Sequence, residues 1–406
     1  MTHTQPLDEQ PLTEQPLSSQ PTARTCPFNP PEEYRTLRAE DPISRVTLPD
    51  GVPGWLVTRY EDVRTVLTDP RFSSKRGRAG GPPTLDGPPP APLPGMFIGM
   101  DAPEHTRFRR LLTGQFTVRR MRQLTPAVEQ IVADQLDLMA EAEGPVDLVQ
   151  AFALPVPSLV ICELLGVPYA DREEFQRYSA TIIRIDATPE EFQEAMQALR
   201  AYIRRLAVAK RENPTDDLLG SLVQSGDLTD EELAGVGALL LLAGHETTAN
   251  MIALSTMCLL RNPEQLAALR ADPSLMDGAV EELLRFLTIV QFGPRRTALE
   301  DIELNGHHIK AGSLVVASVM SGNRDAEHFT GDPEELDLDR PYSPHLAFGH
   351  GIHQCLGQQL ARVEVGAALS ALLQRFPDLR LAVPVEEVPM RDNMIVYGVR
   401  ELPVTW

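Results

Sequence analysis

The chain has 406 residues, 42% of them apolar and 23% charged, which is the composition of a globular protein of one to three domains. Its 37 basic and 57 acidic residues give a formal net charge of −20, which argues against binding to nucleic acid or to an anionic membrane. The four cysteines lie far apart without a CxxC pair, so we expect no disulfide framework and no zinc site, and a reducing, cytoplasmic location.

The N-terminal segment, residues 1–25, repeats Gln-Pro-Leu every five residues. A polar, proline-rich segment buries too little apolar surface to fold, so we expect a disordered tail, and it lacks the apolar core of a secretory signal. Further along, seven prolines fall within residues 81–94 and exclude helix or strand there. A structureless segment of this length inside a domain is typical of a functional or a disordered loop.

Regular elements follow from hydrophobic periodicity, turn residues and capping residues. Helices are predicted near 31–38, 61–67, 104–113, 125–142, 157–165, 171–184, 189–211, 230–260, 264–270, 273–287 and 356–374. Strands are predicted at 45–48, 55–58, 297–303 and 314–319, and the C-terminal residues 379–405 are β-like. No interior linker divides the chain, so we predict one domain that is mainly α with small β-sheets.

The helix predicted from residue 230 is apolar nearly all round, which is typical of a buried helix. Thr229 and Glu232 form the sequence pattern of a capping box at its start. Its apolar run is too short for a membrane span and ends at the polar sequence Gly-His-Glu-Thr-Thr, residues 244–248. A buried acid is costly unless it is paired or functional. A zinc protease is excluded, because HExxH needs histidine where Ala249 stands.

A second unusual segment is the glycine-rich approach to Cys355, from Phe348 to Gly357. Here a cysteine opens a helix, where free backbone N–H groups and the helix N-terminus would stabilise a thiolate. Cys162 and Cys258 lie on apolar helical stretches instead and are interpreted as packed core residues.

These segments together resemble the cytochromes P-450, the haem-thiolate monooxygenases, and above all soluble actinobacterial members. The resemblance covers about residues 26–406, the predicted haem domain, and depends on five motifs in the family's order and spacing. They are the haem loop FxxGxxxCxG at 348–357, AGxETT at 243–248, ExxR at 282–285, the arginine at 340, and the haem-propionate helix at 101–109. One departure is Ala326, where the family often has proline in a structural turn.

The resemblance implies haem b, buried between the long distal helix and the helix after the cysteine loop, with Cys355 as the iron ligand. Glu246 and Thr247 are the implied catalytic pair, which delivers protons to dioxygen, and His245 is expected to face away from the iron. The other implied haem contacts are His105, Arg109, Arg296, His353, Ala243, Gly244, Phe348, Gly349 and Gly357. The small Ala243 and Gly244 are expected to let the helix pass close to the haem. Glu282, Arg285 and Arg340 are expected to form a buried structural ion-pair network.

The expected substrate pocket is apolar and is lined by Met96, Ile98, Ile182, Leu239, Val290, Phe292 and Ile395. This favours hydroxylation of a hydrophobic secondary metabolite or xenobiotic, such as a polyketide, terpenoid, steroid or statin-like compound. The resemblance also implies electrons from NAD(P)H through ferredoxin reductase and ferredoxin, docked near Arg109, Arg110 and Arg362, and a monomeric enzyme without nucleic-acid or membrane partners. Epoxidation, oxidative coupling, peroxygenation and a non-catalytic haem sensor or carrier remain as alternatives, and the substrate and the oxidised atom are not determined.

Overall fold

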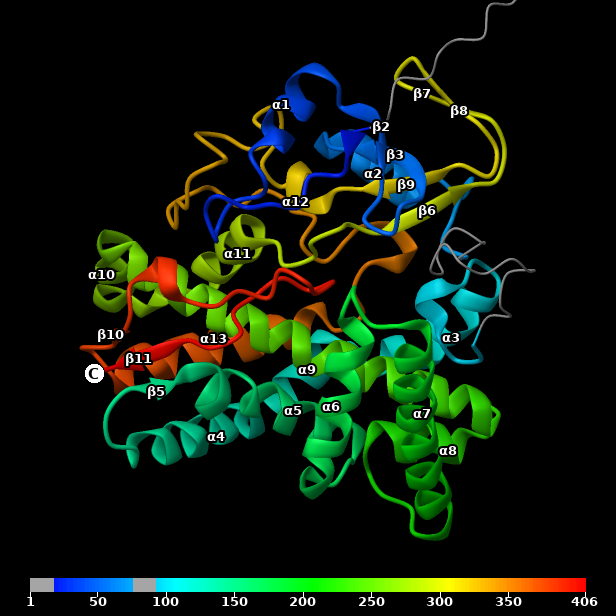
Figure 1. The fold of residues 1–406 in the computed structure, drawn as a ribbon. Coiled ribbons are helices and arrows are strands. Elements are labelled where there is room, and N and C mark those ends of the chain that lie inside the picture. Colours follow the sequence, from blue (N-terminus) through cyan, green and yellow to red (C-terminus); the bar gives the residue numbers. More distant parts are fainter. Residues whose placement is uncertain (1–17, 76–92) are drawn as a thin grey trace, which may run out of the picture.

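The structure is a computed structural model that describes residues 18–75 and 93–406. It has a large helical part and a smaller part built on a β-sheet, with the long helix α9 running across the middle (Figure 1). The predicted class, mainly α with small β-sheets, is confirmed.

The helices occupy most of the predicted positions. Their bounds are α1 Glu33–Glu40, α2 Tyr60–Thr68, α3 Glu104–Thr113, α4 Val118–Ala140, α5 Pro155–Leu165, α6 Arg172–Ile183, α7 Pro189–Glu212, α8 Leu218–Ser225, α9 Asp230–Arg261, α10 Pro263–Ala271, α11 Met276–Leu287, α12 Val319–Gly322 and α13 Gln358–Arg375. Three of them differ from expectation, and one is the four-residue helix α12, which was not predicted. Helix α4 begins before Pro126, because Thr117 caps it by accepting from Arg120 N, and α8 was missed because only Asp217, which accepts from Gly220 N, marks its start.

The strands form three small sheets, one of six, one of three and one of two strands among the described residues. Their bounds are β1 Ser18–Ser19, β2 Ile43–Thr47, β3 Pro53–Val57, β4 Phe72–Ser73, β5 Val146–Asp147, β6 Arg295–Ala298, β7 Ile302–Leu304, β8 His307–Ile309, β9 Leu314–Ala317, β10 Arg380–Leu381 and β11 Pro403–Thr405. The large sheet has the order β1-β2-β3-β9-β6-β4, so the predicted 45–58 hairpin lies next to a strand from the second half of the chain.

The predicted boundary of the N-terminal tail at residue 25 is wrong. Strand β1 pairs in parallel with β2, with Ser18 opposite Val46, and Gln20 N donates to Thr47 O at 2.8 Å. Arg24 lies over the ring of Tyr397, 3.9 Å from its centroid. These partners come from distant parts of the chain, so composition alone did not reveal them. Residues 1–17 of the predicted tail lie outside the described residues.

Helix α9 is the central element of the core, and it packs against α5, α7 and α13. Thr229 and Glu232 form both hydrogen bonds of the predicted capping box. In the part of the chain that the structure describes, no helix has both the length and the apolar character to cross a membrane.

The end of the proline-rich loop crosses the start of α9 at very short range. Gly95 has a φ of +79°, and a Cβ on it would lie 2.1 Å from Glu232 O. Gly235 on α9 is equally close to the loop, because a Cβ on it would lie 1.9 Å from Pro94 O. Arg200 donates to the same oxygen at 2.9 Å. Two glycines therefore allow backbone-to-backbone contact and bring the next residues of the loop beside α9. Residues 76–92, which include most of the predicted 81–94 loop, lie outside the described residues.

Candidate active site

The cysteine loop packs against α2 and leads into α13. Cys355 N donates to Phe348 O at 2.9 Å, and the turn uses two glycines with positive φ, Gly349 and Gly351. Gly351 has no room for a side chain, because a Cβ would lie 2.7 Å from Leu67 O, whereas Gly349 and Gly357 face open space. Cys355 is solvent-accessible although protein surrounds it deeply, which indicates that it faces an internal hollow.

Opposing effects act on the pKa of the Cys355 thiol in the protein alone. Burial raises the pKa of the Cys355 thiol, and this outweighs the lowering by the Gly357 backbone N–H and by Arg109 and Arg362. The thiol is therefore protonated at neutral pH unless a metal ion takes the place of the proton.

A buried basic cluster lies beside this loop. His105 on α3 and His353 lie with ring centroids 4.0 Å apart, and Arg109 donates to Gln354 O at 3.0 Å. Arg296 on β6 is buried and bonds only the backbone oxygen of its neighbour Arg295, at 2.9 Å, among the described residues.

Two ring nitrogens of this cluster lack a partner among the described residues. His105 Nδ1 and His353 Nε2 are buried without a hydrogen bond within the described chain. Burial, followed by the charges of His105 and Arg296, lowers the pKa of His353 to about 3. The positive charge of the cluster is therefore that of Arg109 and Arg296, beside two unpartnered histidine ring nitrogens and with Asp101 close by. An anionic group with two carboxylates, such as the haem propionates, fits these donors.

One face of α9 is open in the middle of an otherwise buried helix. Ala243 is exposed and Thr247, one turn later, is partly exposed, with Thr247 Oγ1 donating to Ala243 O at 2.7 Å. Gly244 packs against α5, since a Cβ there would lie 2.7 Å from Ile161 Cδ1, and it is itself partly exposed. Its expected place beside the haem stays a prediction.

Glu246 is held by an arginine that the sequence did not suggest. Its side chain is 4% exposed, and Oε2 lies 2.7 Å from Nη1 of Arg391 in the C-terminal segment. The two residues are too far apart in the sequence for helical spacing to connect them, and an arginine in a β-like stretch carries no motif. His245 is the expected core histidine, since Nδ1 bonds Leu241 O at 2.8 Å and its ring meets Phe175 edge-on. Burial lowers the pKa of His245.

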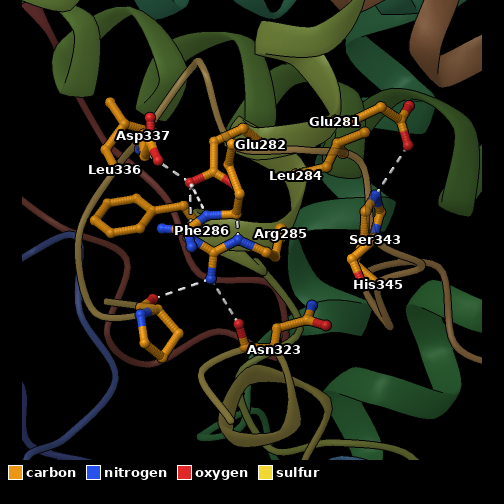
Figure 2. A network of polar contacts seen from close by, with 12 residues as sticks. Glu281, Glu282, Leu284, Arg285, Phe286, Asn323, Leu336, Asp337, Ser343 and His345 are labelled. Carbon is orange, nitrogen blue, oxygen red and sulfur yellow. Dashed lines mark hydrogen bonds and ion pairs between the residues drawn. The ribbon is translucent and has the colours of Figure 1, made fainter. Parts of the chain in front are cut away.

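The expected ion-pair network is present as three side chains in contact. Arg285 Nε and Nη2 each donate to the Glu282 carboxylate at 2.7 Å, and Arg340 Nε donates to it at 3.2 Å. Arg285 also donates to Asn323 O, as Figure 2 shows, and to Pro333 O. The network therefore fastens α11 to the irregular segment 323–340, and every charge in it is paired.

The expected pocket residues do not all lie together. Ile395 N donates to Ile183 O, and Gln291 N donates to Ile395 O, so the end of α6, the residues before β6 and the C-terminal segment meet near Ile182, Val290 and Ile395. Ile182 also belongs with Met96 and Leu239 to the core around α9, whereas Ile98 is 58% exposed. Phe292 instead lines an outer cavity of about 690 Å³ with Leu48, Ile185 and Asp392.

The arginines expected to form a docking face are mostly engaged inside the protein. Arg362 pairs with Glu281 and lies 4.6 Å from the ring centroid of Phe348, and Arg109 bonds the cysteine loop. Arg110 is exposed, and so are Arg119 and Arg122 on the adjacent α4, all three without an ion pair in the described chain. Docking of a ferredoxin near Arg109, Arg110 and Arg362 stays a prediction, and of these three arginines Arg110 is the exposed one.

The fold and this site together define a haem-thiolate protein, and comparison with known proteins agrees. The cytochrome P450 family model matches residues 41–401. Cytochrome P450-SU2 of Streptomyces griseolus is 51% identical over 94% of both chains, and the vitamin D3 dihydroxylase of the same organism is 46% identical over 94% of this chain and 95% of that one. The crystal structure of CYP105P1 in complex with filipin I superposes with a TM-score of 0.91 at 45% identity, covering 96% of this chain and 99% of that chain.

The chain belongs to the cytochrome P450 family. It is a monooxygenase of the bacterial type, whose members use haem b and act on secondary metabolites and xenobiotics.

Proposed function

We propose that this enzyme hydroxylates a large, predominantly apolar secondary metabolite, with electrons from NAD(P)H delivered through a reductase and a ferredoxin in the cytoplasm. The observation that carries the proposal is the open face of α9, where Ala243 and Thr247 are accessible within a buried helix. Relatives named for vitamin D3 and crystallised with filipin I support a substrate of this size and polarity.

In this proposal Cys355 is the ligand to the haem iron, and His105, Arg109, Arg296 and His353 hold the propionates. Bound haem supplies an iron centre at which dioxygen is reduced, with electron density from the thiolate favouring O–O cleavage. Ala243 leaves room for the substrate beside α9. Thr247 would donate a hydrogen bond toward dioxygen, and Glu246, a carboxylate paired with Arg391, would take up protons from solvent and pass them on, which is the proton supply that this cleavage needs.

The electron donor is proposed to dock on the exposed arginines Arg110, Arg119 and Arg122. Ferredoxins of such systems are usually acidic, and these three side chains provide a local basic surface on a chain whose net charge is −20. We propose that the enzyme acts as a monomer.

The test combines binding with turnover. The ferric Soret band is titrated with polyketides, terpenoids, steroids and statin-like acids, and the compounds that shift it are incubated with NAD(P)H, reductase, ferredoxin and isotopically labelled dioxygen. We expect one labelled oxygen atom in the product by mass spectrometry. A compound that shifts the band and is bound but never gains labelled oxygen would overturn the proposal in favour of a carrier or sensor. Oxidation supported by hydrogen peroxide alone would instead identify a peroxygenase.

A further inference from the structure

The carboxylate of Glu246 on α9 makes its shortest ion pair with Arg391. Arg391 Nη1 lies 2.7 Å from Glu246 Oε2, and the two side chains are 14% and 4% exposed. The other nearby base is His245, whose Nε2 is 3.7 Å from Oε1, and burial lowers the pKa of His245 so that it is neutral near pH 7. A carboxylate this deeply buried depends on its permanent counter-charge, which among the described residues is Arg391.

The backbone around Arg391 fixes that guanidinium relative to α9. Arg391 N donates to Gly398 O at 2.9 Å. Gly398 touches α9 directly, since a Cβ on it would lie 1.9 Å from Asn250 Oδ1, and Asn250 Nδ2 donates to Glu246 O at 2.7 Å. These contacts form a closed loop that runs from Arg391 through Gly398 and Asn250 to Glu246 and back to Arg391. The loop holds the acid and its arginine in place relative to each other.

The same segment is attached to the end of α6, which borders the expected pocket. Ile185 N donates to Asn393 O and Ile395 N donates to Ile183 O, both at 3.0 Å. Asn393 Nδ2 also donates to Asp186 Oδ2 at 3.2 Å. Asn393 is only two residues from Arg391, so a displacement of residues 183–186 also displaces the backbone that carries Arg391.

We infer that Arg391 is a positioning residue for Glu246, and that residues 391–395 link the position of this acid to the end of α6. A substrate that packs against the end of α6 then also fixes the group that supplies protons. The inference rests on the proposed function, because it requires proton-dependent reduction of dioxygen.

The test compares three variants of the haem-loaded enzyme with a matched control. Arg391→Met removes the charge at similar length, Arg391→Lys keeps it, and Asn393→Ala cuts the link to Asp186 without touching Glu246. The control is Arg400→Met, because Arg400 is exposed on the same segment and has no side-chain partner in the described chain.

The measurement is the amount of hydrogen peroxide released per NAD(P)H oxidised, with reductase, ferredoxin and vitamin D3 as an apolar probe. This measurement does not require the probe to be oxidised. Haem content, the spectrum of the reduced CO complex and amide exchange at Ile185 and Ile395 are measured alongside.

We expect Arg391→Met to raise the peroxide share several-fold at normal haem content, Arg391→Lys to restore it, and Arg400→Met to match the wild type. Asn393→Ala should speed amide exchange and also raise the peroxide share. An unchanged peroxide share in Arg391→Met, or a lysine variant as impaired as the methionine variant, would overturn the positioning role. Faster exchange in Asn393→Ala without more peroxide would overturn the link to α6. A wild-type enzyme that oxidises no NAD(P)H would overturn the proposed function itself, which distinguishes the two failures.

Discussion

Arg295 and Arg296 are neighbours on β6, yet Arg295 pairs with Asp50 while Arg296 is buried with no carboxylate partner among the described residues. Alternation along a strand sends the two guanidinium groups to opposite faces. This makes Arg295 a natural control for Arg296 in the basic cluster beside the cysteine loop.

Replacing Arg296 with Met is expected to speed the loss of haem to excess apomyoglobin by about 10- to 100-fold, because a hydrogen bond to a charged group contributes about 1.5–3 kcal/mol. Arg295→Met should leave that rate near the wild-type value. Equal rates in both variants would contradict a propionate contact by Arg296.

Thr247→Ala is expected to reduce product formation by up to about 10²-fold while NAD(P)H oxidation continues and peroxide is released, since the variant lacks the hydroxyl that passes protons on. The control is Thr256→Ala in the same helix, because Thr256 Oγ1 also bonds the carbonyl one turn back, at 2.9 Å, but is fully buried. Product per NAD(P)H is the measurement, and full coupling in Thr247→Ala would exclude the proposed role.

Arg285→Ala is expected to destabilise the protein by about 3–5 kcal/mol. The reason is that the buried carboxylate of Glu282 would keep only Arg340 as a charged partner among the described residues. The expected result is haem-free or insoluble protein, checked by haem content and by the urea midpoint. Arg270→Ala, on the exposed face of α10, should change stability by less than about 0.5 kcal/mol. Normal haem loading in Arg285→Ala would refute a structural role for the network.

The stability contributed by Glu281 should depend on pH at the acidic end. Burial alone would raise the pKa of Glu281, but His345, which faces it in Figure 2, and Arg362 lower it from 4.5 to about 2. A lowered folded-state pKa stabilises the fold fully above about 4.5 and loses that effect as the pH falls toward about 2. The difference in urea midpoint between wild type and Glu281→Gln should therefore shrink steadily between pH 5 and pH 2, and a constant difference would show that the carboxylate charge is not involved.

Arg119→Glu is expected to raise the ferredoxin concentration needed for half-maximal turnover and to weaken its dependence on salt, because exposed charges act through screened electrostatics. Arg177→Glu makes the same charge change on the exposed side of α6 and serves as the control. If the two variants behave identically, the ferredoxin does not dock on the surface around Arg119.

The sequence alone determined the features that depend on local spacing. The capping box at Thr229 and Glu232, the buried character of α9 and the glycine-rich approach to Cys355 are all encoded within a few residues. The resemblance to the family came from five local motifs, the haem loop at 348–357, AGxETT at 243–248, ExxR at 282–285, the arginine at 340 and the haem-propionate helix at 101–109. Hydrogen bonds between positions three or four apart need no knowledge of the rest of the chain.

Only the tertiary structure decided which distant residues share these sites. It paired Glu246 with Arg391, packed Gly244 against Ile161, engaged Arg362 with Glu281 and attached residues 18–20 to the large sheet. In each case a side chain or strand edge is satisfied by a partner that the packing of helices and sheets brings near. A buried charge or an unpaired backbone group must find such a partner, but the partner's identity is fixed by the path of the whole chain and leaves no local pattern.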